Sequence, residues 1–542
     1  MTRWLVLSVA RISLRAFLHL LLLSLAAAGQ VAVTTYHNDN YRSGVNSNET
    51  VLTPTNVNEV QFGKLLALPV EGYVYAQPLY VPGVIVNGVM HNVVYVATEH
   101  DQVYAFDANT GALLWQTSFI GTFGNRQIEP LSTNDDLGGC ANLVPEVGIT
   151  GTPVIDLGRQ QLYVVAATKE IVGNNTTIYQ RMHVLDIRSG AENLTNPFFA
   201  APIQARTPGT GSGSVDGYLS FDPRLQNQRS ALALSNGMVF VAWAAHCDTI
   251  PYHGYVMGFN AGSARPNGVI VTTPDGYDGG IWASGSGPAV DAVGNVYVPT
   301  GNGLFDANLG GRDYGDSILR LSWAGIWPVV ADYFTPWDQA MLDAYDIDLA
   351  SGGILLLPDQ PGAPYPHLLV QVGKEGTIDL VHRDNMGHFN PGGDTQIVQT
   401  LPEDALYGVW GALAMWNNNL YIGSVGAPLS AFYYDPVAQQ IEAQYTSATP
   451  EIFSYPGPTP SVSSNGNSNA IVWIIEADDQ NNGLAVLRAY DATNLASELY
   501  NSNLNQTRDQ AGPAVKFAVP TIADGAVFVG AQNEVDVYGL LP

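Results

Sequence analysis

Lysine is scarce in this sequence, with four lysines in 542 residues. Lysine and arginine together number 21 against 48 aspartates and glutamates, so the formal net charge is −27 at pH 7. A chain this acidic is not expected to bind nucleic acid or an anionic membrane surface. Charged residues are nevertheless only 13% of the chain and hydrophobic residues are 46%. The chain can therefore bury a large core, and this composition disfavours intrinsic disorder.

Cysteine is also scarce. The two cysteines, Cys140 and Cys247, could pair in an oxidising compartment or remain as two free thiols. We favour the disulfide. No C-x-x-C-H sequence is present, which excludes a c-type haem attached to this chain.

Only one long apolar run is present, FLHLLLLSLAAA, and it lies close to the N-terminus. Three arginines precede the run and small residues end it, which is typical of a secretory signal. The run is shorter than the roughly 20 residues that a membrane span needs. We therefore predict a signal peptide over residues 1–29, a secreted or periplasmic protein, and no membrane span.

A strand-rich phrase repeats along the chain. VVYVATEHDQVYAFDANTG at 93–111 has counterparts such as QLYVVAATKE with MHVLDIRSG at 161–190 and AVFVGAQNEVDVYGL at 526–540. We count eight copies, spaced roughly 40–65 residues apart, which is typical of a β-propeller. No amphipathic helical pattern alternates with the strands, which disfavours parallel-sheet domains.

The repeats predict an all-β fold with one propeller domain over residues 30–542. We expect eight blades, with seven as the alternative. The last copy ends after two or three strands, so a strand near 62–70 is expected to complete the last blade and cover its edge.

The positions of the lysines indicate a ligand site. Lys169, Lys374 and Lys516 stand at strand ends in three different repeats. Acidic exported proteins can simply be poor in lysine. However, loops at one end of a propeller converge on a central funnel, and several cations directed at that funnel would suit an anionic ligand.

The segment 279–321 contains a G-G-x-x-W phrase with Trp282, then Thr300-Gly301-Asn302, then Gly315-Asp316. This order resembles the quinoprotein alcohol dehydrogenases, eight-bladed propellers that use pyrroloquinoline quinone and Ca²⁺. The resemblance implies that Trp282 forms the floor under the quinone and that Asn302 is a Ca²⁺ ligand. A flat indole suits a planar cofactor, and an amide oxygen suits a hard cation.

Two further phrases imply the catalytic groups. Lys374-Glu375-Gly376, followed by TIDLVHRDN, is similar to the family phrase whose basic residue contacts the reactive quinone oxygen. That similarity implies a catalytic and cofactor-binding role for Lys374. Asp343-Ala344-Tyr345-Asp346 resembles D-x-W-D, which implies that Asp343 is the general base and a metal ligand. The spacing leaves three nearby aspartates as alternatives: Asp338, Asp346 and Asp348.

The remaining matches concern the cofactor and the metal. The resemblance implies that Glu170, in AATKE, is a bidentate Ca²⁺ ligand and that Trp410 is a second funnel tryptophan. We add Lys516 to the cofactor-binding residues because of its strand-end position.

The chain also departs from the family pattern. The two adjacent cysteines that family members usually carry over the quinone are missing, and Glu146 stands where the family has a basic residue. The loop at 245–253 holds His246, Asp248 and His253, but its spacing fits no standard zinc pattern. We predict that it is a funnel or turn loop.

These observations predict an exported, quinoprotein-like dehydrogenase that oxidises an alcohol or sugar hydroxyl. Its electrons would pass to a separate acceptor. The alternative function is a secreted, non-catalytic propeller that binds a ligand or acts as a protein-interaction scaffold, since propellers serve both functions.

Overall fold

A computed structural model describes residues 31–325, 327–402, 406–477 and 483–542. The predicted signal peptide at 1–29 lies outside these ranges. Within them, no helix is both long and apolar enough to cross a membrane. The helical elements of the described residues are all short: α2 (Gln339–Tyr345), α3 (Gln506–Asp509), η1 (Ala283–Gly285), η2 (Ala307–Leu309) and η3 (Leu349–Ser351).

The described residues form eight sheets of four or more strands and a separate pair, β13 (Arg206–Pro208) with β14 (Tyr218–Ser220). The first sheet has β3 (Leu79–Val86), β4 (Val89–Thr98), β5 (Gln102–Asp107) and β6 (Leu113–Ser118). The second has β7 (Gly121–Phe123), β8 (Arg126–Ser132), β9 (Glu146–Val147), β10 (Val154–Asp156), β11 (Gln161–Val172) and β12 (Asn175–Asp186). The third has β15 (Gln226–Asn227), β16 (Ala233–Ser235), β17 (Met238–Ala245), β18 (Tyr255–Asn260) and β19 (Pro266–Val271).

The fourth sheet has β20 (Ala289–Val290), β21 (Val296–Pro299), β22 (Ile318–Ser322), β23 (Val329–Thr335) and β27 (His388–Phe389). The fifth has β24 (Leu355–Leu356), β25 (Leu368–Val372), β26 (Ile378–His382) and β28 (Gln399–Leu401). The sixth has β29 (Ala414–Trp416), β30 (Asn419–Gly423), β31 (Leu429–Asp435), β32 (Gln440–Ile441) and β33 (Ser447–Ala448). The seventh has β1 (Val45–Asn46), β34 (Ser461–Asn465), β35 (Ser468–Glu476), β36 (Val486–Asp491) and β37 (Glu498–Asn501). The eighth has β2 (Phe62–Tyr73), β38 (Thr521–Ala523), β39 (Ala526–Gly530) and β40 (Gln532–Leu540).

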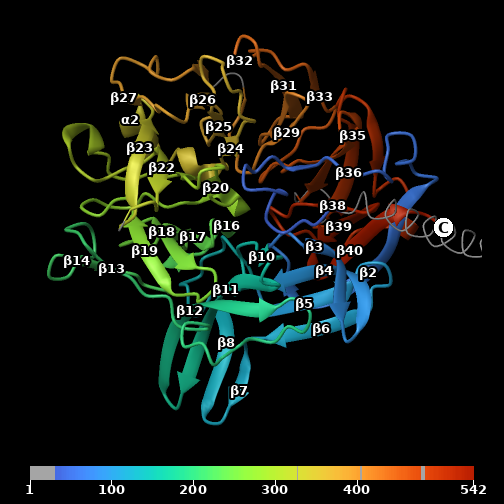
Figure 1. Cartoon of the computed structure of the whole chain (residues 1–542), viewed down its shortest axis with the longest axis horizontal. Helices are drawn as coiled ribbons and strands as arrows, with labels where there is room; N and C mark the ends of the chain where they lie inside the picture. Colours follow the sequence, from blue (N-terminus) through green and yellow to red (C-terminus); the bar gives the residue numbers. More distant parts are fainter. Residues whose placement is uncertain (1–30, 326, 403–405, 478–482) are drawn as a thin grey trace, which may run out of the picture.

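The sheets follow one another around a common centre in chain order, as the colours in Figure 1 show. Apolar clusters fill the space between each sheet and the next, and two of them join the eighth sheet to the seventh and to the first. Because neighbours cover both faces of a sheet, central strands such as β5 are buried at every position rather than alternating. This explains the continuous apolar runs in the repeats.

Strand β2 completes the eighth sheet, as the sequence predicted. It pairs antiparallel with β40, from Phe62 opposite Leu540 to Tyr73 opposite Gln532. An early strand and the last strand of the chain are therefore held in one sheet. The edge of β40 that would otherwise be bare is covered.

A segment ahead of β2, residues 33–46, contacts every sheet; we call it the N-terminal strap. We use "inner strand" for β3, β10, β16, β20, β24, β29, β34 and β38, the strands that the strap meets. It bonds to the sheets in chain order. One hydrogen bond to each sheet is, in turn, Val33 N to Tyr80 O, Ile155 N to Thr34 O, Asn40 Nδ2 to Leu234 O, Val290 N to Asn40 O, Leu356 N to Tyr41 O, Met415 N to Ser43 O, Val462 N to Gly44 O and Asn46 Nδ2 to Ile522 O.

The strap needs unusual backbone and buried donors to follow this path. Gly44 has φ +70°, and a Cβ there would lie 2.8 Å from the Cβ of Ala414, so glycine is required. Arg42 is 0% exposed and donates to the carbonyls of Tyr36, Leu232 and Pro288. The strap occurs once in the chain and is not a copy of the repeat, so the repeats do not predict it.

Candidate functional site

A cavity of about 180 Å³ lies where loops from seven sheets meet. Four residues that the sequence analysis singled out for cofactor binding line it together: Trp282, Lys374, Trp410 and Lys516. The other lining residues are Asn142, Asn227, Arg229, Asp248, Ser284, Asp348, Ser351, Tyr455 and Phe517. The cavity is smaller than the roughly 300 Å³ at which ligand pockets usually begin.

Most of these side chains precede an inner strand. Arg229 comes just before β16, Trp282 before β20, Asp348 before β24, Trp410 before β29 and Lys516 before β38. Equivalent positions in successive sheets thus place their side chains around one axis. Lys374 differs, since it follows β25, where a strand-end cation was expected.

Lys374 and Asp348 form the central ion pair. Lys374 Nζ lies 2.6 Å from Asp348 Oδ2 and 2.9 Å from Asp346 Oδ1. The other oxygen of Asp348 accepts a hydrogen bond from the backbone N of Asn302 at 3.0 Å. Asp348 approaches so closely that a Cβ at Gly301 would collide with its carboxylate. Burial raises the pKa of Asp348, and Lys374 opposes that rise.

Asp343 does not line this cavity. It lies on α2 and accepts a hydrogen bond from the Tyr277 hydroxyl at 3.0 Å. Asp278 is influenced by both Asp343 and Asp348: burial, followed by the charges of Asp248, Asp343 and Asp348, raises its pKa to about 7. The aspartate nearest the predicted lysine is therefore Asp348, one of the alternatives that the spacing left open.

Glu170 also lies elsewhere, on β11. Its two oxygens are 2.6 Å from Arg181 Nη2 and 3.4 Å from Arg126 Nη1, so the carboxylate is committed to arginines. Asn302 lies beside the cavity, because its backbone N bonds to Asp348, and its buried Oδ1 has no hydrogen-bond partner. The three predicted Ca²⁺ ligands, Glu170, Asn302 and Asp343, do not line a common cavity in the structure.

The second half of the cavity is cationic and aromatic. Arg229 is 6% exposed, and its Cζ lies 4.5 Å from the ring centre of Phe517. Lys516 Nζ lies 5.9 Å from the same ring. Tyr455 packs edge-on against both Phe517 and Trp410. Burial, with Arg229 nearby, lowers the pKa of Lys516 to about 8.

Cys140 and Cys247 are joined by a disulfide with an S–S distance of 2.12 Å. Each cysteine is within two positions of a lining residue, Asn142 or Asp248, so the bond ties together two loops at the cavity. In the loop at 245–253, Asp248 borders the cavity while His253 is bonded to Thr273 and Ser212. The loop is thus a cavity loop in part.

Glu146, which replaces a basic family residue, accepts from His100 Nδ1 at 2.8 Å and does not line the cavity. The sequence analysis missed Arg229, Tyr455 and Phe517. A usable signal was present: each precedes an apolar inner strand by a few residues, as Trp282 and Trp410 do.

No protein-family profile matches the sequence, and no curated protein matches it. Solved structures do resemble it. The quinohemoprotein alcohol dehydrogenase from Comamonas testosteroni is similar at TM-score 0.60 and 15% identity, over 95% of this chain and 81% of that one. The quinohemoprotein alcohol dehydrogenase ADHIIG from Pseudomonas putida HK5 is similar at 0.57 and 14%, over 94% and 80%. A europium-containing methanol dehydrogenase is similar at 0.53 and 12%, over 94% and 98%.

This likeness shows the fold: the ring of sheets is a β-propeller, as in quinoprotein alcohol dehydrogenases. At identities of 12–15% it says nothing further about chemistry.

Proposed function

We propose that this protein is a quinoprotein-like dehydrogenase that binds pyrroloquinoline quinone in the cavity and oxidises an alcohol or sugar hydroxyl. The observation that supports the proposal most is the convergence of Trp282, Trp410, Lys374 and Lys516 on one cavity. These residues come from different sheets, and sequence patterns alone predict a cofactor-binding role for each.

The proposal includes the architecture and location. The chain is one domain over residues 30–542 with eight blades, a count that the eight larger sheets support. Residues 1–29 are an export signal, and the protein works in the periplasm or outside the cell. Electrons leave to a separate acceptor because the chain carries no haem-attachment sequence.

The lining suits the quinone in kind. Indole faces at Trp282 and Trp410 can pack on a planar ring system, and the cations Arg229, Lys374 and Lys516 can bind its carboxylates and carbonyl oxygens. Pyrroloquinoline quinone, when bound, supplies a two-electron acceptor. The residues of the chain have to hold the substrate, take its proton and exclude water.

Asp348 is the proposed general base. Its carboxylate faces the cavity, is 5% exposed and is held on opposite oxygens by Lys374 and Asn302. It would take the hydroxyl proton of the substrate. Burial raises its pKa above the usual value for an aspartate, and Lys374 opposes that rise. Lys374 stabilises the negative charge that develops nearby.

The predicted Ca²⁺ ligands do not fit a calcium ion, so the proposed mechanism uses none. Glu170 is bound to two arginines, and Lys374 Nζ already lies against the oxygens of Asp348 and Asp346. The unpartnered Oδ1 of Asn302 is a single donor, whereas Ca²⁺ needs about six to eight oxygens.

Quinone titration tests the proposal. Adding pyrroloquinoline quinone to the purified mature protein should quench tryptophan fluorescence and shift the quinone's visible absorption. Trp282→Ala should weaken binding roughly tenfold or more because a buried aromatic face is lost. Trp327→Ala is the matched control, since that side chain is 76% exposed. Absence of saturable binding by the wild type would sink the proposal.

A second function, a non-catalytic ligand-binding propeller, is favoured by the small volume of the cavity. Dye-coupled oxidation of short alcohols and sugars by the quinone-loaded protein separates the two. Turnover supports the dehydrogenase, and saturable binding without turnover for any hydroxyl substrate supports the binding protein.

A further inference from the structure

Two cations in the cavity have no acidic partner. Among the described residues, neither Arg229 nor Lys516 makes an ion pair or a hydrogen bond, and the buried Nη2 of Arg229 has none. The other three lysines all pair with acids: Lys64 with Asp536, Lys169 with Asp136 and Lys374 with Asp348. Arg42 is also buried without an acid, but it donates to backbone carbonyls, whereas Arg229 has no such bonds in the part of the chain that the structure describes.

Burial of Arg229 and Lys516 without a hydrogen-bond or ion-pair partner costs free energy. Arg229 is 6% exposed, and both cations lie against the same ring of Phe517. Burial lowers the pKa of Arg229 and, helped by the charge of Arg229, that of Lys516. Buried charges are normally paired, so two adjacent unpaired cations indicate a missing anion.

Neighbouring acids do not fill this role. Glu99 influences Arg229 electrostatically, but its Oε2 accepts from Gly148 N and Thr150 Oγ1, and burial raises its pKa to about 7. Asp348 is held by Lys374, and Asp248 accepts from the Tyr252 hydroxyl. Asn142 and Asn227 line the same cavity as Arg229 and Lys516, and their side-chain amides are uncharged.

We propose that Arg229 and Lys516 form a carboxylate-binding subsite for a planar aromatic ligand, which lies along Phe517, Tyr455 and Trp410. This inference builds on the proposed quinone site. The quinoprotein family has a basic residue where this chain has Glu146. In this chain, cations from different sheets would take over the role of that residue. Guanidinium and ammonium groups together suit a carboxylate, and the aromatic side chains suit the ring that bears it.

The test compares charged and neutral forms of the same ligands. Affinities are measured by fluorescence and calorimetry for pyrroloquinoline quinone and its trimethyl ester, and for benzene-1,3-dicarboxylate and its dimethyl ester. The wild type should prefer each acid to its ester at least tenfold. Arg229→Gln and Lys516→Gln should each weaken acid binding roughly 10- to 100-fold, the range for a charge-assisted hydrogen bond, and leave ester binding unchanged.

Arg206→Gln is the matched control because Arg206 also lies over an aromatic ring, that of Tyr218, but on the surface. Arg229→Lys keeps the charge if Arg229→Gln fails to fold, and the acid-to-ester preference of the wild type needs no variant.

Equal quinone binding by wild type and Arg229→Gln would overturn this subsite and leave the proposed function intact. Binding of the dicarboxylate without the quinone would support the subsite and refute the proposed function. Binding of neither acid would refute both.

Discussion

At the level of single residues, the site depends on which aspartate meets Lys374. The motif implied Asp343, but α2 carries Asp343 away to Tyr277, and Asp348 takes the place beside the lysine. The two differ by five positions in the chain. A D-x-[WY]-D spacing could not separate them, because the short helix α2 and the 3-10 turn η3 set where each side chain points.

Asp348→Asn should lower turnover by roughly 100-fold or more while quinone affinity changes little, since a base acts in the transition state. Asp343→Asn is the matched control and should keep near wild-type activity. The measurement is kcat from dye-coupled assays together with quinone Kd from titration. The reverse pattern would restore Asp343 as the base.

Lys516 predicts a pH dependence. Its pKa falls from 10.5 to about 8 in the folded protein, with Arg229 the charge that contributes; Lys374, Asp248 and Asp348 also border the cavity. Between about 8 and 10.5 the unfolded chain binds more protons, so the ligand-free protein should gain stability as pH rises. Anion binding should weaken over the same range, because the ammonium is lost.

The measurement is melting temperature and dicarboxylate affinity from pH 7 to 10, in wild type and Lys516→Gln. The variant should lose both trends, which run in opposite directions. A wild-type affinity that stays flat across this range would contradict the assignment of Lys516 to the anion.

At the level of elements, the disulfide holds two cavity loops across 107 residues of sequence. In the chain-entropy model, a loop of that size stabilises by very roughly 4–5 kcal/mol. Reduction should therefore lower the melting temperature and weaken quinone binding. The Cys140→Ser/Cys247→Ser variant should show the same losses and no further response to reductant. Detection of two labelled thiols in the unfolded, unreduced protein would rule out the bond.

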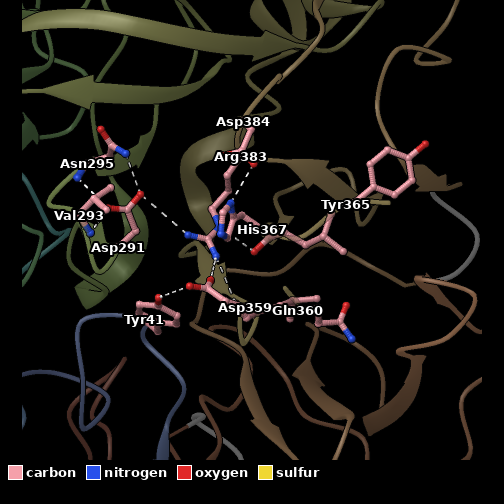
Figure 2. Close-up of polar contacts among 12 residues, drawn as sticks. Tyr41, Asp291, Val293, Asn295, Asp359, Gln360, Tyr365, His367, Arg383 and Asp384 are labelled. Carbon is pink, nitrogen blue, oxygen red and sulfur yellow. Dashed lines mark hydrogen bonds and ion pairs between the residues drawn. The ribbon is translucent and has the colours of Figure 1, made fainter. Parts of the chain in front are cut away.

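A second contact between elements lies between the fourth and fifth sheets. Figure 2 shows Arg383, which is 2% exposed, directed toward Asp359 at 2.6 Å and toward Asp291 at 3.9 Å. The strap joins this group through the Tyr41 hydroxyl, which donates to Asp359. The network thus ties two sheets and the strap together.

Arg383→Met should reduce the free energy of unfolding by roughly 1–3 kcal/mol, because it leaves the buried carbonyls of Leu368 and Leu357 without their donor and removes the ion pair with Asp359. Denaturant titration measures the loss. Arg188→Met removes an exposed pair with Asp186 and should cause no measurable change. An equally small effect for Arg383→Met would mean that water or other groups replace the guanidinium.

At the level of the whole molecule, the strap and β2 hold the ring together in different ways. Strand β2 joins the first and last parts of the chain in one sheet, whereas the strap bonds to the inner strands of all eight. The strap is drawn in blue near the centre of the ring in Figure 1. One local segment therefore contributes to every interface at once.

Replacing residues 33–46 by a glycine-serine linker of equal length should lower the melting temperature by roughly 5–10 °C. The basis is eight hydrogen bonds at about 1 kcal/mol each in a large domain. Calorimetry and light scattering measure stability and association. Deleting 30–72 removes β2 as well and should cause aggregation through the bared edge of β40. A monomeric deletion variant with an unchanged melting temperature would contradict both roles.

The sequence by itself determined the repeat, the all-β class, the closing strand and four cavity residues. These follow from local patterns: apolar runs between turns, an incomplete last repeat, and a Trp282, Lys374 and Trp410 order similar to a known family. Such signals survive because every sheet must bury its faces and cover its edges whatever the distant contacts are.

Only the tertiary structure revealed the strap and showed that Asp348 is the aspartate beside Lys374. It also showed that Glu170 pairs with Arg181 and that Arg229 and Lys516 line the same cavity. Arg229 and Lys516 are 287 positions apart in the printed sequence and come from the third and eighth sheets. Their proximity depends on how the ring closes. No spacing along the chain encodes that closure, because it results from packing between all neighbouring sheets.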